Sequence, residues 1–164
     1  MKKLWAIPIS IILIIFDYYT KYLTRLHLNN TSKPIIEDVF ELTFVKNTGA
    51  AFGMLKNQRI FFIIITVVFL IISFVLLYKL NLTKRYIPFG LCIIFLLSGA
   101  IGNFIDRITL GYVTDMFYFK LINFPVFNVA DCYITVSVAV LIVLILFIYK
   151  DDEPIFTSKT NKNQ

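Results

Sequence analysis

The chain has 164 residues, of which 59% are hydrophobic and 16% are charged, and its mean hydropathy is +0.80. This composition excludes an ordinary soluble domain and indicates a membrane protein. The net charge of +6 does not indicate a nucleic-acid partner, because the basic residues are scattered at the ends of apolar segments instead of forming one patch. Anionic membrane lipids are the expected counterpart.

Four apolar segments are separated by polar connections, and each is long enough for a transmembrane helix, which needs roughly 20 residues. They run from Leu4 to about Leu23, Ile60 to about Tyr78, Ile87 to about Phe104 and Val129 to about Tyr149. The first resembles a secretory signal but lacks a small-residue cleavage site, so we expect a retained helix. The predicted fold is membrane α-helical: a single four-span domain over residues 1–150, followed by a polar cytoplasmic tail over residues 151–164.

Four spans put both termini on one side of the membrane and two loops, about Thr24 to Arg59 and about Ile105 to Asn128, on the other. Eight of the 16 basic residues lie on the terminal side, so their number alone does not decide the orientation. Six of them are close to helix ends, where the positive-inside rule gives them weight: Lys2, Lys3, Lys79, Lys84, Arg85 and Lys150. We therefore expect a multi-pass protein of the cytoplasmic membrane with both termini in the cytoplasm.

The first loop contains the pattern of a half-buried β-strand. Phe40, Leu42 and Phe44 alternate with Glu41 and Thr43. A small extracytoplasmic β-sheet is therefore predicted, with the loop after Ile105 as a second extracytoplasmic segment. Gly49 and Gly53, further along the first loop, permit tight turns and close approach of the backbone to another group.

Polar residues at the helix ends and in the loops all fall on the loop side of this topology. They are Asp17, Lys21, Asn47, Asn103, Asp106, Arg107, Asp115, Asn128 and Asp131. Asp17 and Lys21 are four residues apart, as are Asn103 and Arg107, so each pair shares a helix face if the helix extends that far. This is the pattern of a site assembled from several helices.

Each of these features also has a structural interpretation. Asp17 and Lys21 are compatible with a pair that neutralises itself near the headgroups, with Lys21 extending outward. Arg107 is compatible with an ordinary interfacial anchor. Asn128 and Asp131 have the spacing of a helix N-cap and its acidic partner.

The residue inventory narrows the possible chemistry. His27 is the only histidine, no HExxH motif is present, and no cluster offers three or four metal ligands, which argues against a zinc protease. A serine or cysteine mechanism lacks a suitably placed base. Cys92 and Cys132 suggest neither a disulfide nor a metal site. Carboxylate chemistry without metal or cofactor remains.

Asp115 and Asp131 are the candidates for that chemistry, since they bracket the start of the last apolar span, where a buried charge is costly. Asp115 follows Val113 closely in an apolar setting, although a solvated aspartate also fits. Two neighbouring aspartates share one proton, so one acts as base and the other as acid. Such a pair can activate water against a peptide carbonyl and support departure of the amine.

Five segments in order resemble the motifs of bacterial lipoprotein signal peptidase, also called signal peptidase II. They are DYYTK (17–21), NTGAAFG (47–53), GNFIDR (102–107), VTDMF (113–117) and FNVAD (127–131). The resemblance implies an intramembrane aspartic peptidase that removes signal peptides from prolipoproteins by cutting before a diacylglyceryl-modified cysteine. It also implies a site near the extracytoplasmic surface, and we expect the protein to act as a monomer.

The resemblance assigns the catalytic pair to Asp115 and Asp131. It implies that further residues shape or support the site: Asp17, Lys21, Asn47, Gly49, Asn103, Arg107, Asn128 and Ala130. The chain departs from the family pattern at Tyr18, Thr114 and Cys132, where Gln, Val and Ser are usual.

Two non-enzymatic alternatives stay open from the residues. One is a small transporter or scaffold whose charged residues form an ion path, which an inverted repeat would favour, and we find none. The other is an assembly factor with purely structural aspartates.

Overall fold

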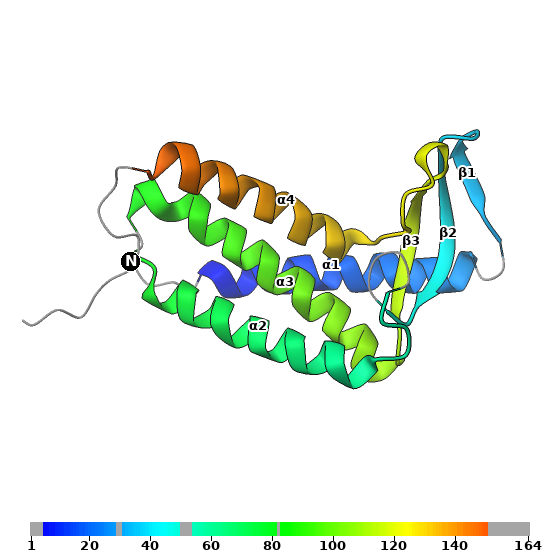
Figure 1. Cartoon of the computed structure of the whole chain (residues 1–164), viewed down its shortest axis with the longest axis horizontal. Helices are drawn as coiled ribbons and strands as arrows, with labels where there is room; N and C mark the ends of the chain where they lie inside the picture. Colours follow the sequence, from blue (N-terminus) through cyan, green and yellow to red (C-terminus); the bar gives the residue numbers. More distant parts are fainter. Residues whose placement is uncertain (1–4, 29–30, 50–53, 82, 151–164) are drawn as a thin grey trace, which may run out of the picture.

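The structure is a computed structural model that describes residues 5–28, 31–49, 54–81 and 83–150. Figure 1 shows a bundle of helices with a small β-sheet packed across one end. Lys2, Lys3, Gly53 and the predicted tail over residues 151–164 lie outside the described residues.

Four helices form the bundle, and each is long and apolar enough to cross a membrane. They are α1 (Ala6–His27), α2 (Arg59–Lys79), α3 (Ile87–Thr109) and α4 (Val129–Val143), which continues as a π-helical turn (Leu144–Ile148). A 3-10 turn (Lys84–Tyr86) precedes α3. The four predicted spans are therefore confirmed. The start of α1 and the end of α4 lie at the end of the bundle opposite the sheet (Figure 1).

Two helix ends differ from the prediction. Helix α1 continues to His27 instead of ending near Leu23, and α3 continues to Thr109 instead of ending near Phe104. The apolar runs stop earlier than the helices do, because the last turns carry polar side chains that contact other elements, namely Thr24 and Arg25 on α1 and Asp106 and Arg107 on α3. Asp106 and Arg107 therefore lie on a helix and not in a loop.

The sheet has three antiparallel strands in the order β1-β2-β3. They are β1 (Lys33–Ile36), β2 (Phe40–Asn47) and β3 (Val113–Phe119). The strand predicted around Phe40 to Phe44 is confirmed, whereas the expected loop around Asp115 is wrong, because this segment pairs with β2. The pairing sets Asn47 opposite Val113 and Val45 opposite Asp115. Asn47 and Asp115 thus lie close together on the neighbouring strands β2 and β3.

Helix α3 is the centre of the bundle, since α1, α2 and α4 all pack against it. Close packing depends on glycine: an added side chain at Gly99 would collide with the Ala130 carbonyl of α4, and one at Gly102 with the Asp17 carboxylate of α1. Helices α2 and α4 present apolar side chains outward, as expected for contact with lipid. The apolar core lies at the end remote from the sheet, around Ile93 and Ile94.

Candidate active site

The site begins with a buried ion pair on α1. Lys21 Nζ lies 2.8 Å from Asp17 Oδ2, and both residues are fully buried. Lys21 Nζ also donates a hydrogen bond to Asn103 Oδ1 on α3 (2.8 Å) and lies 3.9 Å from Asp106 Oδ2. The pairing of Asp17 with Lys21 was predicted, but the interpretation of Lys21 as an outward-extending residue is wrong. A buried ammonium requires such a complete set of partners.

Asp17 ties α1 to the start of α4. Its Oδ1 accepts a hydrogen bond from the backbone N–H of Ala130 (2.9 Å), and Ala130 is completely buried. Since Gly102 leaves room for the carboxylate, the first turn of α4 can approach α1 and α3 closely. The Asp17 carboxylate, paired with Lys21, thus holds the backbone at Ala130 and so fixes the position of the next residue, Asp131.

Asp115 lies on β3 with only 2% of its surface exposed. Asn47 Nδ2 donates to its Oδ2 (2.8 Å), and Asn128 Nδ2 donates to its Oδ1 (2.6 Å). The interpretation as a plain solvated aspartate is therefore wrong. Both carboxylate oxygens are held by amides from other elements.

Asp131 belongs to a capping box at the start of α4. Asn128 Oδ1 accepts from the backbone N–H of Asp131 (3.1 Å), and Asp131 Oδ2 accepts from the backbone N–H of Asn128 (3.1 Å). The predicted capping role is confirmed, but it does not occupy the whole carboxylate. Asn103 Nδ2 donates to the other oxygen, Oδ1 (2.8 Å). Asn128 therefore donates to both carboxylates, to that of Asp115 through its side-chain amide and to that of Asp131 through its backbone N–H.

Burial raises the pKa of Asp115 from its ordinary value of 3.8 to about 7, and the nearby charge of Asp131 acts in the same direction. The hydrogen bonds from Asn47 and Asn128 and the charge of Lys21 oppose this rise in pKa. Asp115 therefore keeps its proton to a higher pH than an ordinary aspartic acid does.

One cavity of about 380 Å³ contains both aspartates. Its polar lining includes Asn47, Gly49, Asn103, Arg107 and Thr135, and its apolar lining includes Val113 and the segment from Phe124 to Phe127. Arg107 Nη2 donates to the Gly49 carbonyl (3.3 Å), and its guanidinium lies 4.8 Å from the centre of the Phe62 ring. Arg107 thus lines the site and is more than an interfacial anchor.

A second, mostly apolar hollow of about 230 Å³ adjoins this cavity between α2, α3 and α4. Ile65, Thr66 and Phe69 line it from α2, Ala100 from α3 and Ile134 from α4. Asn103 and Arg107 line both spaces. These two residues therefore border both the apolar hollow and the cavity that contains the aspartates.

The described residues contain no group of three or more His, Cys, Asp or Glu side chains that could hold a metal ion. The chemically active groups in the cavity are thus two carboxyl groups, a guanidinium and several amides.

Comparison with known proteins identifies the family. Residues 9–147 match the profile of the family described as signal peptidase (SPase) II. The chain belongs to the signal peptidase II family. A lipoprotein signal peptidase of Streptococcus thermophilus is 43% identical over 155 residues, which cover 93% of this chain and 97% of that protein. One of Brevibacillus brevis is 45% identical over 140 residues, covering 85% and 93%.

A solved structure of the same architecture supports the membership. The structure of a bacterial membrane enzyme determined by the in meso method at 2.3 Å resolution aligns with a TM-score of 0.77 and 31% identity. The alignment covers 94% of each chain. The chain therefore shares its fold with a solved membrane enzyme.

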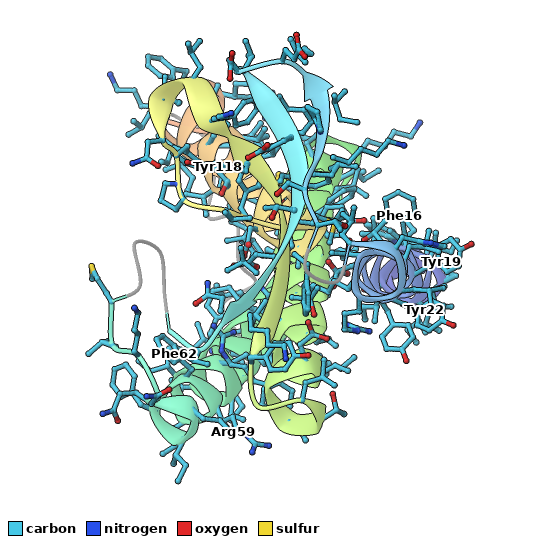
Figure 2. All side chains as sticks on the ribbon, turned by 90° about the vertical axis from the view of Figure 1, so that its right-hand side faces the viewer. Phe16, Tyr19, Tyr22, Arg59, Phe62 and Tyr118 are labelled. Atoms are coloured by element: carbon cyan, nitrogen blue, oxygen red, sulfur yellow. The ribbon has the colours of Figure 1, made fainter. Side chains whose placement is uncertain are left out.

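The structure places the three departures from the usual signal peptidase II pattern in different environments. Tyr18 is 52% exposed, and Figure 2 shows its neighbours Phe16, Tyr19 and Tyr22 on α1 directed away from the rest of the molecule. Cys132 is half-buried and is a free thiol. Thr114 is completely buried beside Asp115 in the chain. Thr114 also forms hydrogen bonds with two charged side chains, those of Asp106 and Arg25.

Sequence reasoning left Arg25 and Thr114 out of the site, and it grouped Asp106 with the polar residues of the loop side without giving it a role. Asp106 Oδ2 accepts from the backbone N–H of Thr114 (2.9 Å), and Arg25 Nη1 donates to Thr114 Oγ1 (2.8 Å). A signal for Arg25 existed, since it lies one helical turn after Lys21 and therefore on the same face. The assumed helix end at Leu23 concealed it.

Proposed function

We propose that this protein is an aspartic endopeptidase that removes signal peptides from prolipoproteins, cutting before a cysteine that carries a diacylglyceryl group. The observation that carries the proposal is the shared environment of Asp115 and Asp131, which line one cavity and are both hydrogen-bonded to Asn128. Membership of the signal peptidase II family and the relatives named lipoprotein signal peptidase support the substrate class.

The proposed reaction uses the two carboxyl groups in different protonation states. Asp115, whose pKa is raised to about 7, holds the shared proton, and Asp131 acts as the carboxylate base. Asp131 takes a proton from water as the oxygen attacks the scissile carbonyl, while Asp115 donates its proton to the developing oxyanion. As the tetrahedral intermediate collapses and its C–N bond breaks, Asp131 passes the proton taken from water to the departing amine, and Asp115 takes back the proton that it gave to the oxyanion.

Supporting residues keep this arrangement in place. Asn47 and Asn128 orient the carboxyl group of Asp115, and Asn103 orients that of Asp131. Arg107 lies where the cavity meets the apolar hollow, so its guanidinium is a donor for carbonyl oxygens of the bound peptide. Asp17 and Lys21, through Ala130 and Asn103, support the site from α1, and Gly49 accepts the hydrogen bond that directs Arg107.

The apolar hollow between α2 and α4 suits a substrate that arrives within the bilayer. An apolar signal segment in this hollow would place its end beside Asn103 and Arg107, next to the aspartates. With both termini in the cytoplasm, as the basic residues favour, the sheet and the site lie near the extracytoplasmic surface. All the residues involved belong to one chain and to residues 1–150, which we regard as a single peptidase domain acting as a monomer.

The distribution of polar groups does not favour the alternative of a transporter or ion-pathway protein. An ion path requires polar groups along the whole bundle. The described buried charges gather at the sheet end, whereas the opposite end has an apolar core around Leu80, Ile93 and Ile94.

The decisive experiment is cleavage of a diacylglyceryl-modified lipoprotein precursor by the purified full chain in detergent. Asp115→Asn and Asp131→Asn keep the shape of the side chain but remove a carboxyl group, so each should lower kcat at least about 1,000-fold. Asp38→Asn is the matched control, because Asp38 is exposed on the turn between β1 and β2. Cleavage at a near wild-type rate by either site variant would contradict the shared-proton mechanism.

A further inference from the structure

A second polar cluster lies behind β3, on the face of the strand that does not line the cavity. Successive side chains of a strand point to opposite faces, so Thr114 and Met116 face away from the side of Asp115. Both contact the last turn of α1: Arg25 Nη1 donates to Thr114 Oγ1 (2.8 Å), and Thr24 Oγ1 lies 3.4 Å from Met116 Sδ. Helix α1 is thus the support on which this part of β3 rests.

Asp106 of α3 closes the cluster into a ring. Its Oδ2 accepts from the backbone N–H of Thr114 (2.9 Å), and its Oδ1 lies 3.7 Å from Arg25 Nη1. Thr114 is therefore held at its backbone by an acid from α3 and at its side chain by a base from α1. The ring joins α1, α3 and β3 at the residue that precedes Asp115.

Burial makes each of these contacts costly to lose. The Arg25 side chain is 19% exposed, that of Asp106 is 2% exposed, and Thr114 is completely buried. A buried charged group left without a partner destabilises the arrangement that buries it. Loss of the Arg25 guanidinium or of the Thr114 hydroxyl leaves the other group without this hydrogen-bond partner. Asp106, in contrast, keeps the backbone N–H of Thr114 and lies 3.9 Å from Lys21 Nζ. We expect β3 to be the element that moves in response.

We propose that Arg25 is a positioning residue for Asp115, acting through Thr114 to fix the height and rotation of β3 relative to the cavity. The inference rests on the proposed peptidase function. Among the described residues no hydrogen bond or ion pair joins Arg25 to Asp115 or to Asp131, so Arg25 acts only through the strand. Small displacements matter, since a misplacement of about 1 Å at a catalytic group can cost about 100-fold in rate.

The test is a double-mutant cycle on cleavage of the diacylglyceryl-modified precursor. Thr114→Val removes the hydroxyl at nearly constant volume, and Arg25→Met removes the guanidinium while keeping an extended side chain. We expect each single variant to lower kcat about tenfold with KM within about twofold, and the double variant to be no slower than the slower single. Lys120→Met is the matched control, because Lys120 is exposed and pairs only with Asp38 of the turn between β1 and β2 among the contacts described.

The pH profile separates positioning from loss of folded protein. Asp115 is faced by Asp131 from α4, Lys21 from α1, Arg107 from α3 and Asn47 from β2. The hydrogen bond from Asn47 lowers the pKa of Asp115. A shift of β3 weakens this bond and so raises that pKa, and the alkaline limb of kcat/KM should therefore move to higher pH in Thr114→Val. A smaller folded fraction would lower the plateau without moving the limb. Arg25→Lys should recover part of kcat.

Four outcomes would overturn the inference: unchanged kcat in both single variants, multiplicative effects in the double variant, a lowered plateau with an unmoved limb, or no recovery in Arg25→Lys. If the wild-type protein itself leaves the precursor uncut, the proposed function fails as well. Wild-type cleavage with unaffected variants would contradict only the role of Arg25.

Discussion

The two ends of the helix bundle bury opposite kinds of side chain. At the end remote from the sheet, the buried side chains are apolar, with Leu80, Ile93 and Ile94 almost inaccessible. At the sheet end the equally inaccessible side chains are polar or charged, with Asp17, Lys21 and their hydrogen-bond partners at the centre. Apolar packing is non-directional, whereas buried hydrogen bonds require each partner at one place.

This contrast predicts different responses to substitution. A smaller side chain in the apolar end leaves a small cavity, and the loss of stability grows with the volume of that cavity because the helices relax around it only in part. A lost partner at the sheet end leaves a charge or an amide unsatisfied, with a cost that spreads to the groups still bonded to it. Substitutions at the apolar end should therefore lower stability in small steps, whereas substitutions at the sheet end should lower the rate of cleavage strongly.

The largest effect in this comparison is expected for Lys21→Met. The ammonium pairs with Asp17 and donates to Asn103, so its loss leaves a buried carboxylate uncompensated. Breaking a buried ion pair in this way costs about 3–5 kcal/mol, and cleavage should fall at least about 100-fold. Thermal unfolding and kcat in detergent measure the two effects. Lys33→Met, on the exposed β1, is the control, and near wild-type values for Lys21→Met would remove the contrast.

A change of intermediate size is expected for Asn47→Ala, in the pH dependence of kcat/KM. Asp115 keeps its proton below its pKa of about 7 and loses it above, so wild-type cleavage should decline as the pH rises through about 7. The bond from Asn47 lowers this pKa, so its removal should raise the pKa of Asp115 and move the alkaline limb upward by about one pH unit. Ser32→Ala, in the exposed part of the sheet region, should leave the limb in place. A limb that moves downward would show that the sign is wrong.

The smallest effect on cleavage is expected for Ile94→Val, at the centre of the apolar end. The side chain is completely buried, so loss of one methylene should lower stability by about 0.5–1.5 kcal/mol. The site should keep its geometry, and kcat should stay within about twofold of wild type. Thermal unfolding and steady-state cleavage on the same preparation test both statements. A tenfold fall in kcat would show that the two ends are coupled through α3.

The parts of this molecule that the sequence predicts are those that depend on local pattern. The four spans follow from runs of apolar residues, and β2 follows from the alternation of Phe40, Leu42 and Phe44. Strand β3 could not be found in this way, because Val113 to Met116 are all buried, so no alternation of apolar and polar residues marks this segment. The helix ends at His27 and Thr109 depend likewise on contacts that only the folded chain provides.

The sequence predicted which residues belong to the candidate site better than it predicted the hydrogen bonds that join them. Asp17, Asp115 and Asp131 attract notice because they are acids beside apolar segments. The sequence treats capping and catalysis by Asp131 as alternatives, whereas the structure shows that its two oxygens have different partners. Nothing local indicates that Asn103 joins Lys21 to Asp131, since this link spans three helices.

The capping box at the start of α4 makes the order of one helical turn inseparable from the order of the site. The Asn128 side chain closes the first turn of α4 by accepting a hydrogen bond at Oδ1, and it holds Asp115 by donating one from Nδ2. If that turn unwinds, Asp131 loses its orientation and Asp115 loses one of its two donors at the same moment. Fraying of this first turn would thus leave the helix bundle folded but the carboxyl groups of Asp115 and Asp131 out of position. Under the proposed function, the fraction of molecules able to cleave substrate is the fraction in which α4 begins at Val129.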